Sequence, residues 1–135
     1  MKQKIKTALI SVSDKTDLSK VLQTLNKYKV KIISSGGTYK SIKQLGYPCT
    51  EVSSYTGFKE MLDGRIKTLH PKIHAGILHD RSNKRHSQEM DKQKFPSLDL
   101  IIVNFYPFQK IVNNSKNNKE IIENIDIGGP TMVRA

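Results

Sequence analysis

The sequence predicts an α/β domain built on an open, mostly parallel sheet with flanking helices. Short apolar runs typical of buried strands alternate along the chain with segments of helical periodicity. A length of 135 residues is enough for one hydrophobic core and too short for two independent ones. We therefore treat residues 1–135 as one domain and expect one site, outside the carboxyl ends of the strands.

The first third of the chain contains two predicted strand–helix units. Residues 7–12 form a short apolar run, and residues 18–25 then carry leucine or valine at i, i+3, i+4 and i+7. Residues 30–33 form a second β-rich run, and residues 39–45 return to helical spacing. Gly46 is placed to end that helix.

The remaining strands are predicted at residues 49–52 and 98–103. The second is the strongest in the chain, because only Asp99 interrupts its apolar run. Continuous apolar runs of this kind are typical of parallel strands covered on both faces. The spacing of apolar residues at 58–62 predicts a short helix, and residues 82–94 predict a polar one that faces solvent.

The chain ends in a predicted helix, and the connection before the strongest strand is long. Pro130 suits the first turn of a helix, whereas residues 112–119 are polar. A connection as long as residues 55–96 usually carries function.

The charge is spread along the chain rather than concentrated. The net charge is +11, and only four of the 23 basic residues are arginines. Scattered lysines usually form a solvated surface, so we expect no nucleic-acid partner and favour a small phosphorylated ligand. The lone Cys49 fits a reducing compartment, and neither a signal peptide nor an apolar run of about 20 residues is present. We expect a cytoplasmic protein with no membrane partner.

Four loops follow strands or open helices and should converge: residues 11–15, 34–38, 104–108 and 126–130. The first two combine hydroxyls, glycines and a lysine at strand-to-helix turns, where free N–H groups favour an anion. The SGGT motif lacks the spacing of a P-loop or a dinucleotide fold, so ordinary turn chemistry remains an alternative. Helix capping by Ser13 or Asp14 is the alternative for the first loop.

The segment GRIKTLHPKIHAG at residues 64–76 concentrates polar groups. Arg65 and Lys67 would project the same way from an extended backbone and could clamp a phosphate or stabilise an oxyanion, although a solvated loop is the simpler alternative. His70 and His74 lack the glutamate of HExxH, so we expect no metal. Asp126 precedes a Gly-Gly-Pro helix start, where capping alone would explain it.

The motifs SVSDKT, SSGGT, EMLDGRIKTLHPKIHAGIL, NFYPF and IDIGGPTMVRA, in this order over essentially the whole chain, resemble the N-terminal domain of the bifunctional AICAR transformylase/IMP cyclohydrolase family. The resemblance implies a three-layer, Rossmann-like fold of the methylglyoxal-synthase-like type. It implies closure of FAICAR (5-formamidoimidazole-4-carboxamide ribonucleotide) to IMP with loss of water, the last step of purine biosynthesis. No metal or cofactor is expected in this domain, since 10-formyltetrahydrofolate serves only the family's separate formyltransferase domain. A full-length parent would be a homodimer.

The resemblance also assigns roles to residues through their motifs. It makes Lys67, Tyr106 and Asp126 catalytic. It assigns substrate binding to the following residues, with the phosphate held mainly by the first seven: Ser11, Ser13, Lys15, Ser35, Gly36, Gly37, Thr38, Arg65, Thr68, Asn104 and Gly128.

The family continues after this point with Ala-Ala-Lys-Asn and a last strand, and that lysine is thought to work beside the aspartate that matches Asp126. The sequence here stops at Ala135, so we expect nucleotide affinity with little cyclohydrolase activity. Three alternatives remain: a nucleotide-sensing domain as in carbamoyl-phosphate synthetase, methylglyoxal synthase, and a basic nucleic-acid-binding module. The GRIKTLHP and NFYPF segments favour the cyclohydrolase, and the catalytic motifs of methylglyoxal synthase are not found.

Overall fold

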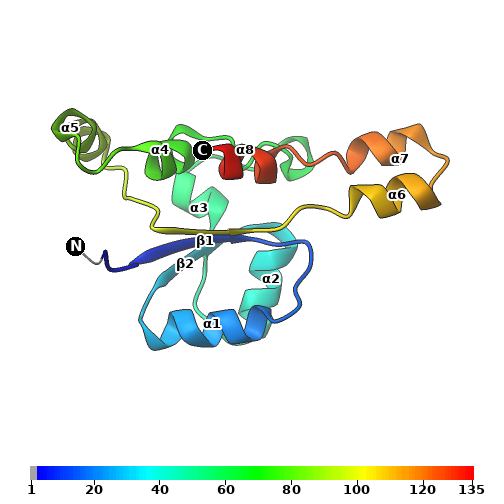
Figure 1. The fold of residues 1–135 in the computed structure, drawn as a ribbon, viewed down its shortest axis with the longest axis horizontal. Helices are drawn as coiled ribbons and strands as arrows, with labels where there is room; N and C mark the ends of the chain where they lie inside the picture. Colours follow the sequence, from blue (N-terminus) through cyan, green and yellow to red (C-terminus); the bar gives the residue numbers. More distant parts are fainter. Residues whose placement is uncertain (1–2) are drawn as a thin grey trace.

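The computed structural model describes residues 3–135 and contains one open sheet (Figure 1). Its strands are β1 (Thr7–Ser11), β2 (Lys31–Ser34), β3 (Thr50–Glu51) and β4 (Leu100–Val103), in the spatial order β3-β2-β1-β4. All three pairings are parallel. The predicted open, parallel α/β sheet is therefore confirmed.

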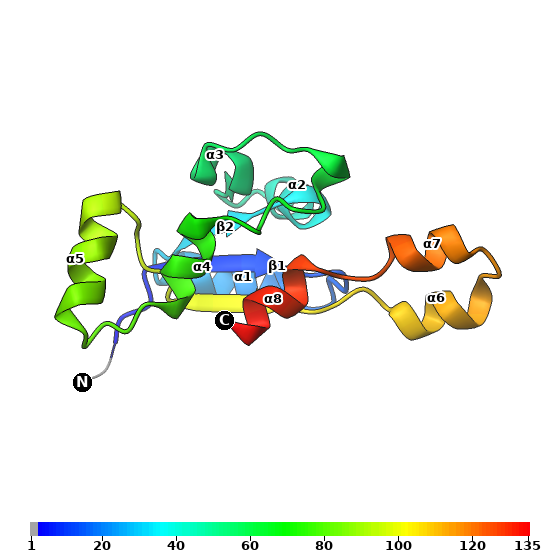
Figure 2. The ribbon, with the colours of Figure 1, turned by 90° about the horizontal axis from the view of Figure 1, so that it is seen from above.

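Helices cover both faces of the sheet and produce three layers (Figure 1). Helices α1 (Leu18–Lys27) and α2 (Gly36–Gln44) lie on one face. Helices α3 (Val52–Thr56), α4 (Pro71–Leu78) and α8 (Gly128–Arg134) lie on the other. Helix α5 (Lys84–Gln93) lies at one end of the molecule, and α6 (Phe108–Asn114) and α7 (Asn118–Glu123) lie at the opposite end (Figure 2).

The two faces of the sheet form two cores, because successive side chains of a strand point to opposite sides. Ala8 and Ile10 of β1 pack with the leucines of α1 and with Ile42 of α2. Leu9 of β1 packs in the other core with Ile73 of α4 and with residues of α3 and α8. Ala8, Leu9 and Ile10 are each at most 1% exposed, so the central strand is covered on both faces as predicted for buried parallel strands.

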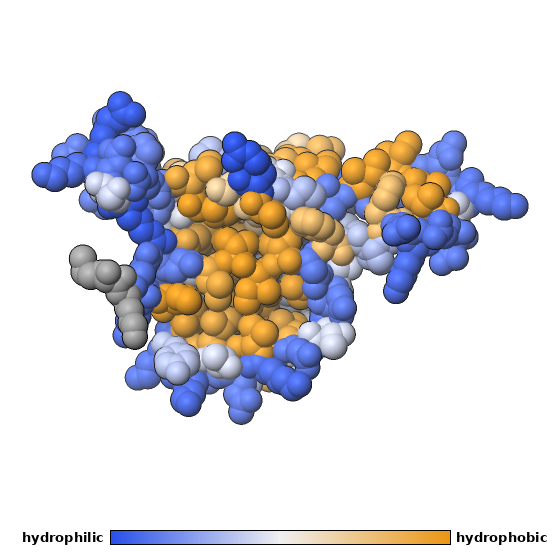
Figure 3. Space-filling view, viewed as in Figure 1, coloured by the Kyte–Doolittle hydropathy of each residue, from blue (hydrophilic) through white to orange (hydrophobic). Residues whose placement is uncertain are grey.

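Strand β4 is less buried than the central strand. It lies at the edge of the sheet, and each of its four residues is only half-buried. Figure 3 shows that apolar side chains gather on the molecular face on which this edge lies. Leu100 and Ile102 nevertheless pack against one core, and Ile101 and Val103 pack against the other, so β4 is covered on both faces as expected. Its partial exposure comes from its place at the edge of the sheet.

The long connection 55–96 is helical in places that the sequence pattern did not indicate. The helix predicted at 58–62 is wrong: α3 ends before it, at Gly57 with φ +74°, and only a 3₁₀ turn, Leu62–Gly64, follows. Helix α4 was not predicted; it begins after His70, whose Nδ1 accepts from the Lys72 backbone N–H at 3.0 Å. The predicted polar helix is confirmed as α5, capped by Asn83.

Helices α6 and α7 form a hairpin beyond the carboxyl ends of the strands (Figures 1 and 2). The sequence suggested only a polar segment here, because each helix is too short to show a clear helical period. The hairpin lies between the NFYPF loop and the IDIGG loop in the sequence. Both loops nevertheless lie at the same end of the sheet. None of the helices described in residues 3–135 has the length and hydropathy of a membrane span.

Candidate functional site

Two adjoining cavities lie outside the carboxyl ends of the strands. The hairpin chamber, about 330 Å³, lies beside residues 123–129. The glycine-loop chamber, about 230 Å³, lies over residues 35–38. Five residues line both cavities and make them one site: Ser11, Ser35, Lys67, Tyr106 and Asp126.

Every residue to which the resemblance assigned a catalytic or binding role lines one or both chambers. Ser13, Lys15, Gly36, Gly37, Thr38 and Asn104 line the glycine-loop chamber alone. Arg65, Thr68 and Gly128 line the hairpin chamber alone. The four loops therefore converge on one site, as expected.

The glycine-loop chamber is built around the start of α2. Ser35 is the N-cap of this helix, yet its hydroxyl makes no capping hydrogen bond. Gly36 has φ +55°, and a Cβ there would lie 2.9 Å from the Lys67 ammonium nitrogen. A Cβ at Gly37 would lie 3.9 Å from the ammonium nitrogen of Lys15. Two cations thus lie close to the N-terminus of α2. Because Gly36 and Gly37 have no side chains, the backbone there is accessible, and this arrangement suits an anion.

Thr38 has a structural task in this chamber. Its hydroxyl donates to the Val12 carbonyl at 2.9 Å and accepts from the Val12 N–H at 3.1 Å. The side chain is buried and joins the first loop to the second.

The loop after β1 differs from a simple strand-to-helix turn. Helix α1 begins only at Leu18, and its N-cap is Asp17, in the left-handed region, so neither Ser13 nor Asp14 caps it. Asp14 instead accepts from the backbone and side chain of Thr16 at 2.9 and 2.6 Å, and these hydrogen bonds lower the pKa of its carboxyl. This loop therefore offers side chains to a ligand rather than a helix N-terminus.

Asn104 holds that loop in place. Its Oδ1 accepts from the backbone N–H groups of Ser13 and Asp14, at 2.6 and 3.0 Å. Its Nδ2 donates to the Asp14 carbonyl at 2.8 Å. The Asn104 amide, which is predicted to bind substrate, thus forms hydrogen bonds with the backbone of the neighbouring loop.

The backbone at residues 65–68 turns instead of extending, so the extended geometry expected for this segment is wrong. Arg65 has φ −65° and ψ −27°, in the right-handed helical region. The turn still directs both cations into the site: Arg65 lines the hairpin chamber and Lys67 lines both chambers. Lys67 also lies 3.8 Å from Glu60, and Thr68 below it is buried.

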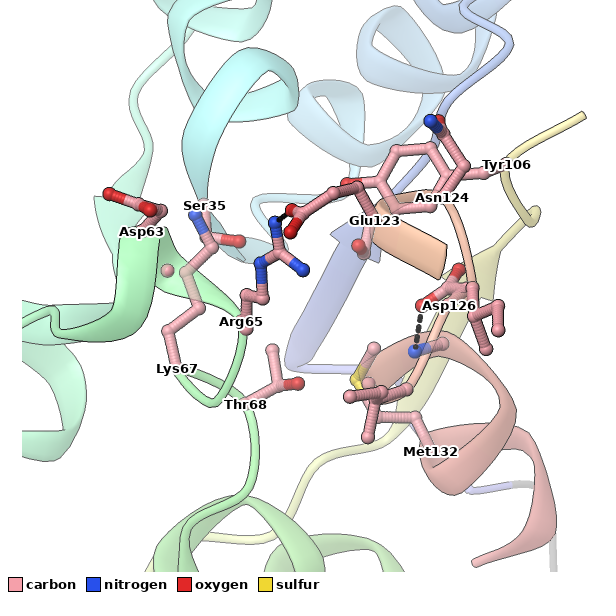
Figure 4. Close-up of a pocket in the computed structure, with 16 residues that line it drawn as sticks. Ser35, Asp63, Arg65, Lys67, Thr68, Tyr106, Glu123, Asn124, Asp126 and Met132 are labelled. Atoms are coloured by element: carbon pink, nitrogen blue, oxygen red, sulfur yellow. Dashed lines mark hydrogen bonds and ion pairs between the residues drawn. The ribbon is translucent and has the colours of Figure 1, made fainter. Parts of the chain in front are cut away.

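Asp126 carries out the turn role that its position suggested and also faces the cavities. Its Oδ1 accepts from the Gly129 N–H at 3.0 Å, which fixes the start of α8 (Figure 4). The carboxylate also lines both chambers, as does the half-exposed Tyr106. A carboxylate and a phenolic hydroxyl therefore lie where the chambers meet.

Several lining residues were missed by the sequence interpretation: Asp63, Gly64, Glu123, Asn124, Ile125, Ile127, Gly129 and Met132. Glu123 forms an ion pair with Arg65 inside the hairpin chamber (Figure 4). No local pattern distinguishes Glu123 from other acidic residues, because its role depends on the hairpin bringing it back to residues 64–68.

The described residues, 3–135, contain no group of three His, Cys, Asp or Glu side chains arranged to hold a metal ion. The charges that face the site are the cations Lys15, Arg65 and Lys67 and the acids Asp63, Glu123 and Asp126. The lysines line the glycine-loop chamber, whereas Asp63 and Glu123 line only the other one. The acids are therefore concentrated at the hairpin end of the site, and both lysines lie at the glycine end.

Comparisons with known proteins agree with this architecture. The family of MGS-like domains matches residues 17–131. Among solved structures, the crystal structure of ForH is similar, with a TM-score of 0.80 and 25% sequence identity. The similarity covers 96% of this chain and 66% of the ForH chain, so this chain spans about two thirds of the length of ForH. The chain belongs to the MGS-like domain family.

Proposed function

We propose that this domain is an IMP cyclohydrolase, which closes the formamide and carboxamide groups of FAICAR into the second purine ring. One observation supports the proposal: residues of the GRIKT, NFYPF and IDIGG motifs line the same two-chambered site as the SGGT loop. A nucleotide monophosphate has a matching polarity, with a dianion at one end and a neutral base at the other. Its phosphate would bind over Gly36 and Gly37, and its base would extend into the hairpin chamber.

In the reaction, the carboxamide nitrogen attacks the formyl carbon and forms the new C–N bond. The formyl oxygen then leaves as water, with one proton from the carboxamide nitrogen and one from the formamide nitrogen. Both reacting groups belong to one molecule, and well-oriented intramolecular reactions reach effective molarities of about 10⁵ M or more. Positioning of the formyl group in the closing rotamer is therefore the main task of the protein.

The remaining task is the handling of charge. Lys67 lies between the two chambers, where its ammonium can stabilise the oxyanion that develops on the formyl oxygen, with Tyr106 as a second donor. Asp126 already accepts one backbone N–H through Oδ1, so Oδ2 is the oxygen that would accept a proton from the carboxamide. Each role is part of the proposal.

Absorbance of FAICAR solutions tests the reaction directly, with this chain and with a chain continued by Ala-Ala-Lys-Asn. We expect ring closure by the longer chain and binding of IMP by both. Failure of both chains to close the ring would contradict the cyclohydrolase proposal. IMP binding without closure would favour a nucleotide-sensing domain, and oligonucleotide binding that weakens steeply with salt would favour a nucleic-acid-binding module.

A further inference from the structure

The Arg65–Glu123 ion pair joins two walls of the hairpin chamber that are distant in sequence. Arg65 comes from the turn that follows the 3₁₀ segment Leu62–Gly64, and Glu123 is the last residue of α7. Figure 4 shows the two side chains pointing toward one another within the chamber. The side chains are 37% and 42% exposed, so water and a ligand can both reach the pair.

The dipole of helix α7 does not favour an acid at this place. Glu123 lies at the C-terminal end of the helix, where the helix dipole disfavours a negative charge. A basic side chain would be favoured there on local grounds alone. The pair with Arg65 is a tertiary contact that offsets this unfavourable local effect.

The pair also leaves Arg65 able to bind. It engages Nη2, and among residues 3–135 no hydrogen bond accompanies it from Nε or Nη1. A guanidinium group has five N–H donors in a rigid plane, so an acid on one edge fixes the direction of the others. Because Glu123 holds one edge of the Arg65 guanidinium, the remaining N–H groups can face the chamber.

The hairpin itself depends on such contacts for its place. Helices α6 and α7 pack mainly against each other, and the loops at the two ends of the hairpin carry Tyr106 and Asp126. A tie from Glu123 to the Arg65 turn therefore fixes the hairpin relative to the opposite wall of the chamber.

We propose that Glu123 is a positioning residue of this site, which holds the Arg65 guanidinium with its free N–H groups directed at the bound nucleotide. The proposal rests on the proposed nucleotide-binding function and extends it to a residue outside the catalytic motifs. Arg65 is the group that touches the ligand, and Glu123 acts through it.

The order of the Arg65 side chain can be measured without any ligand. The chain has four arginines, so the Nε–H signal of Arg65 in a ¹⁵N-labelled sample is assigned by its loss in Arg65→Lys. We expect a sharp signal with a high heteronuclear NOE in the wild type and a broadened or mobile one in Glu123→Gln. Glu89→Gln is the matched control, because it breaks the surface pair of Glu89 with Arg85 on α5 and should leave the Arg65 signal unchanged.

Calorimetry with IMP supplies the functional half of the test. Glu123→Gln should weaken IMP binding about tenfold, a size typical of one charge-assisted hydrogen bond. The same substitution should have no further effect when added to Arg65→Met, because Glu123 acts only through Arg65. An unchanged Arg65 signal in Glu123→Gln, or additive losses in the double variant, would overturn the proposal. Absence of IMP binding by the wild type would instead contradict the proposed function, while the Arg65 signal still decides the role of Glu123.

Discussion

The side-chain amide of Asn104 forms two hydrogen bonds with the backbone of Asp14, 90 residues earlier in the chain. Oδ1 accepts from the Asp14 N–H at 3.0 Å, and Nδ2 donates to the Asp14 carbonyl at 2.8 Å. Because Asn104 directly follows β4 and Asp14 lies in the loop after β1, the contact ties two adjacent strand ends together. It sets the shape of the loop that carries Ser13 and Lys15 to the site.

Asn104→Ala should therefore loosen the first loop and weaken nucleotide binding. We expect IMP affinity to fall several-fold, and the free energy of unfolding to fall by about 1 kcal/mol, since the lost hydrogen bonds are solvent-exposed. Calorimetry and urea denaturation measure the two effects. Asn113→Ala, at an exposed position of α6, is the control. Unchanged affinity in Asn104→Ala would show that the loop keeps its shape without the amide.

Gly36→Ala should impair the site through Lys67. The new Cβ would lie 2.9 Å from the Lys67 ammonium nitrogen, and φ +55° is costly for alanine, about 1 kcal/mol. Gly46→Ala is a matched control, because Gly46 has φ +83° and a Cβ at this residue would have no atom within 4 Å. Both variants should lose similar stability in thermal unfolding, but only Gly36→Ala should lose IMP affinity. Equal affinity of the two variants would refute the clash.

Lys67→Ala should separate catalysis from binding if Lys67 stabilises the oxyanion. Removal of one such donor typically lowers kcat by about 10² to 10³. IMP has no developing oxyanion, so its dissociation constant should change far less. Turnover of FAICAR and calorimetric titration with IMP, both in the chain continued by Ala-Ala-Lys-Asn, give the comparison. Equal losses in turnover and in binding would remove the catalytic role.

Asp99 should make the stability of the domain depend on pH in the acid range. Burial of its side chain raises the pKa, but hydrogen bonds from the Lys6 and Thr7 N–H groups and from Arg81 outweigh burial and hold the pKa below its usual value. A carboxyl with a lowered folded-state pKa stabilises the fold above its unfolded pKa, about 3.9, and loses this effect as pH falls through the folded value.

Urea denaturation at a series of pH values measures this effect. A range from about pH 6 to about pH 3 is suitable because it spans the unfolded pKa of about 3.9. The free energy of unfolding of the wild type should fall more steeply below about pH 4 than that of Asp99→Asn. Asp91→Asn, on the exposed face of α5, should follow the wild type. Parallel curves for the wild type and Asp99→Asn would contradict the role of Asp99.

Local pattern was enough for the elements with a strong period. The sequence predicted α1 from the helical spacing of residues 18–25, and β1 and β2 from the apolar runs at 7–12 and 30–33. These predictions succeeded because the spacing of buried side chains follows the period of the element. Residues 58–62 had too few apolar positions to fix a period, and α3 lies earlier than the pattern indicated.

The sequence by itself determined which loops form the site, because the carboxyl ends of parallel strands meet at one edge of a sheet. Only the tertiary structure decided what each side chain does there. It shows that Asn104 and Thr38, which line the glycine-loop chamber, also form hydrogen bonds with the backbone of the first loop. It also brings Glu123 into contact with Arg65. These contacts join residues from 26 to 90 positions apart, or bring a helical hairpin back onto a distant turn. Local periodicity carries no information about such pairs, since they depend on how the elements pack.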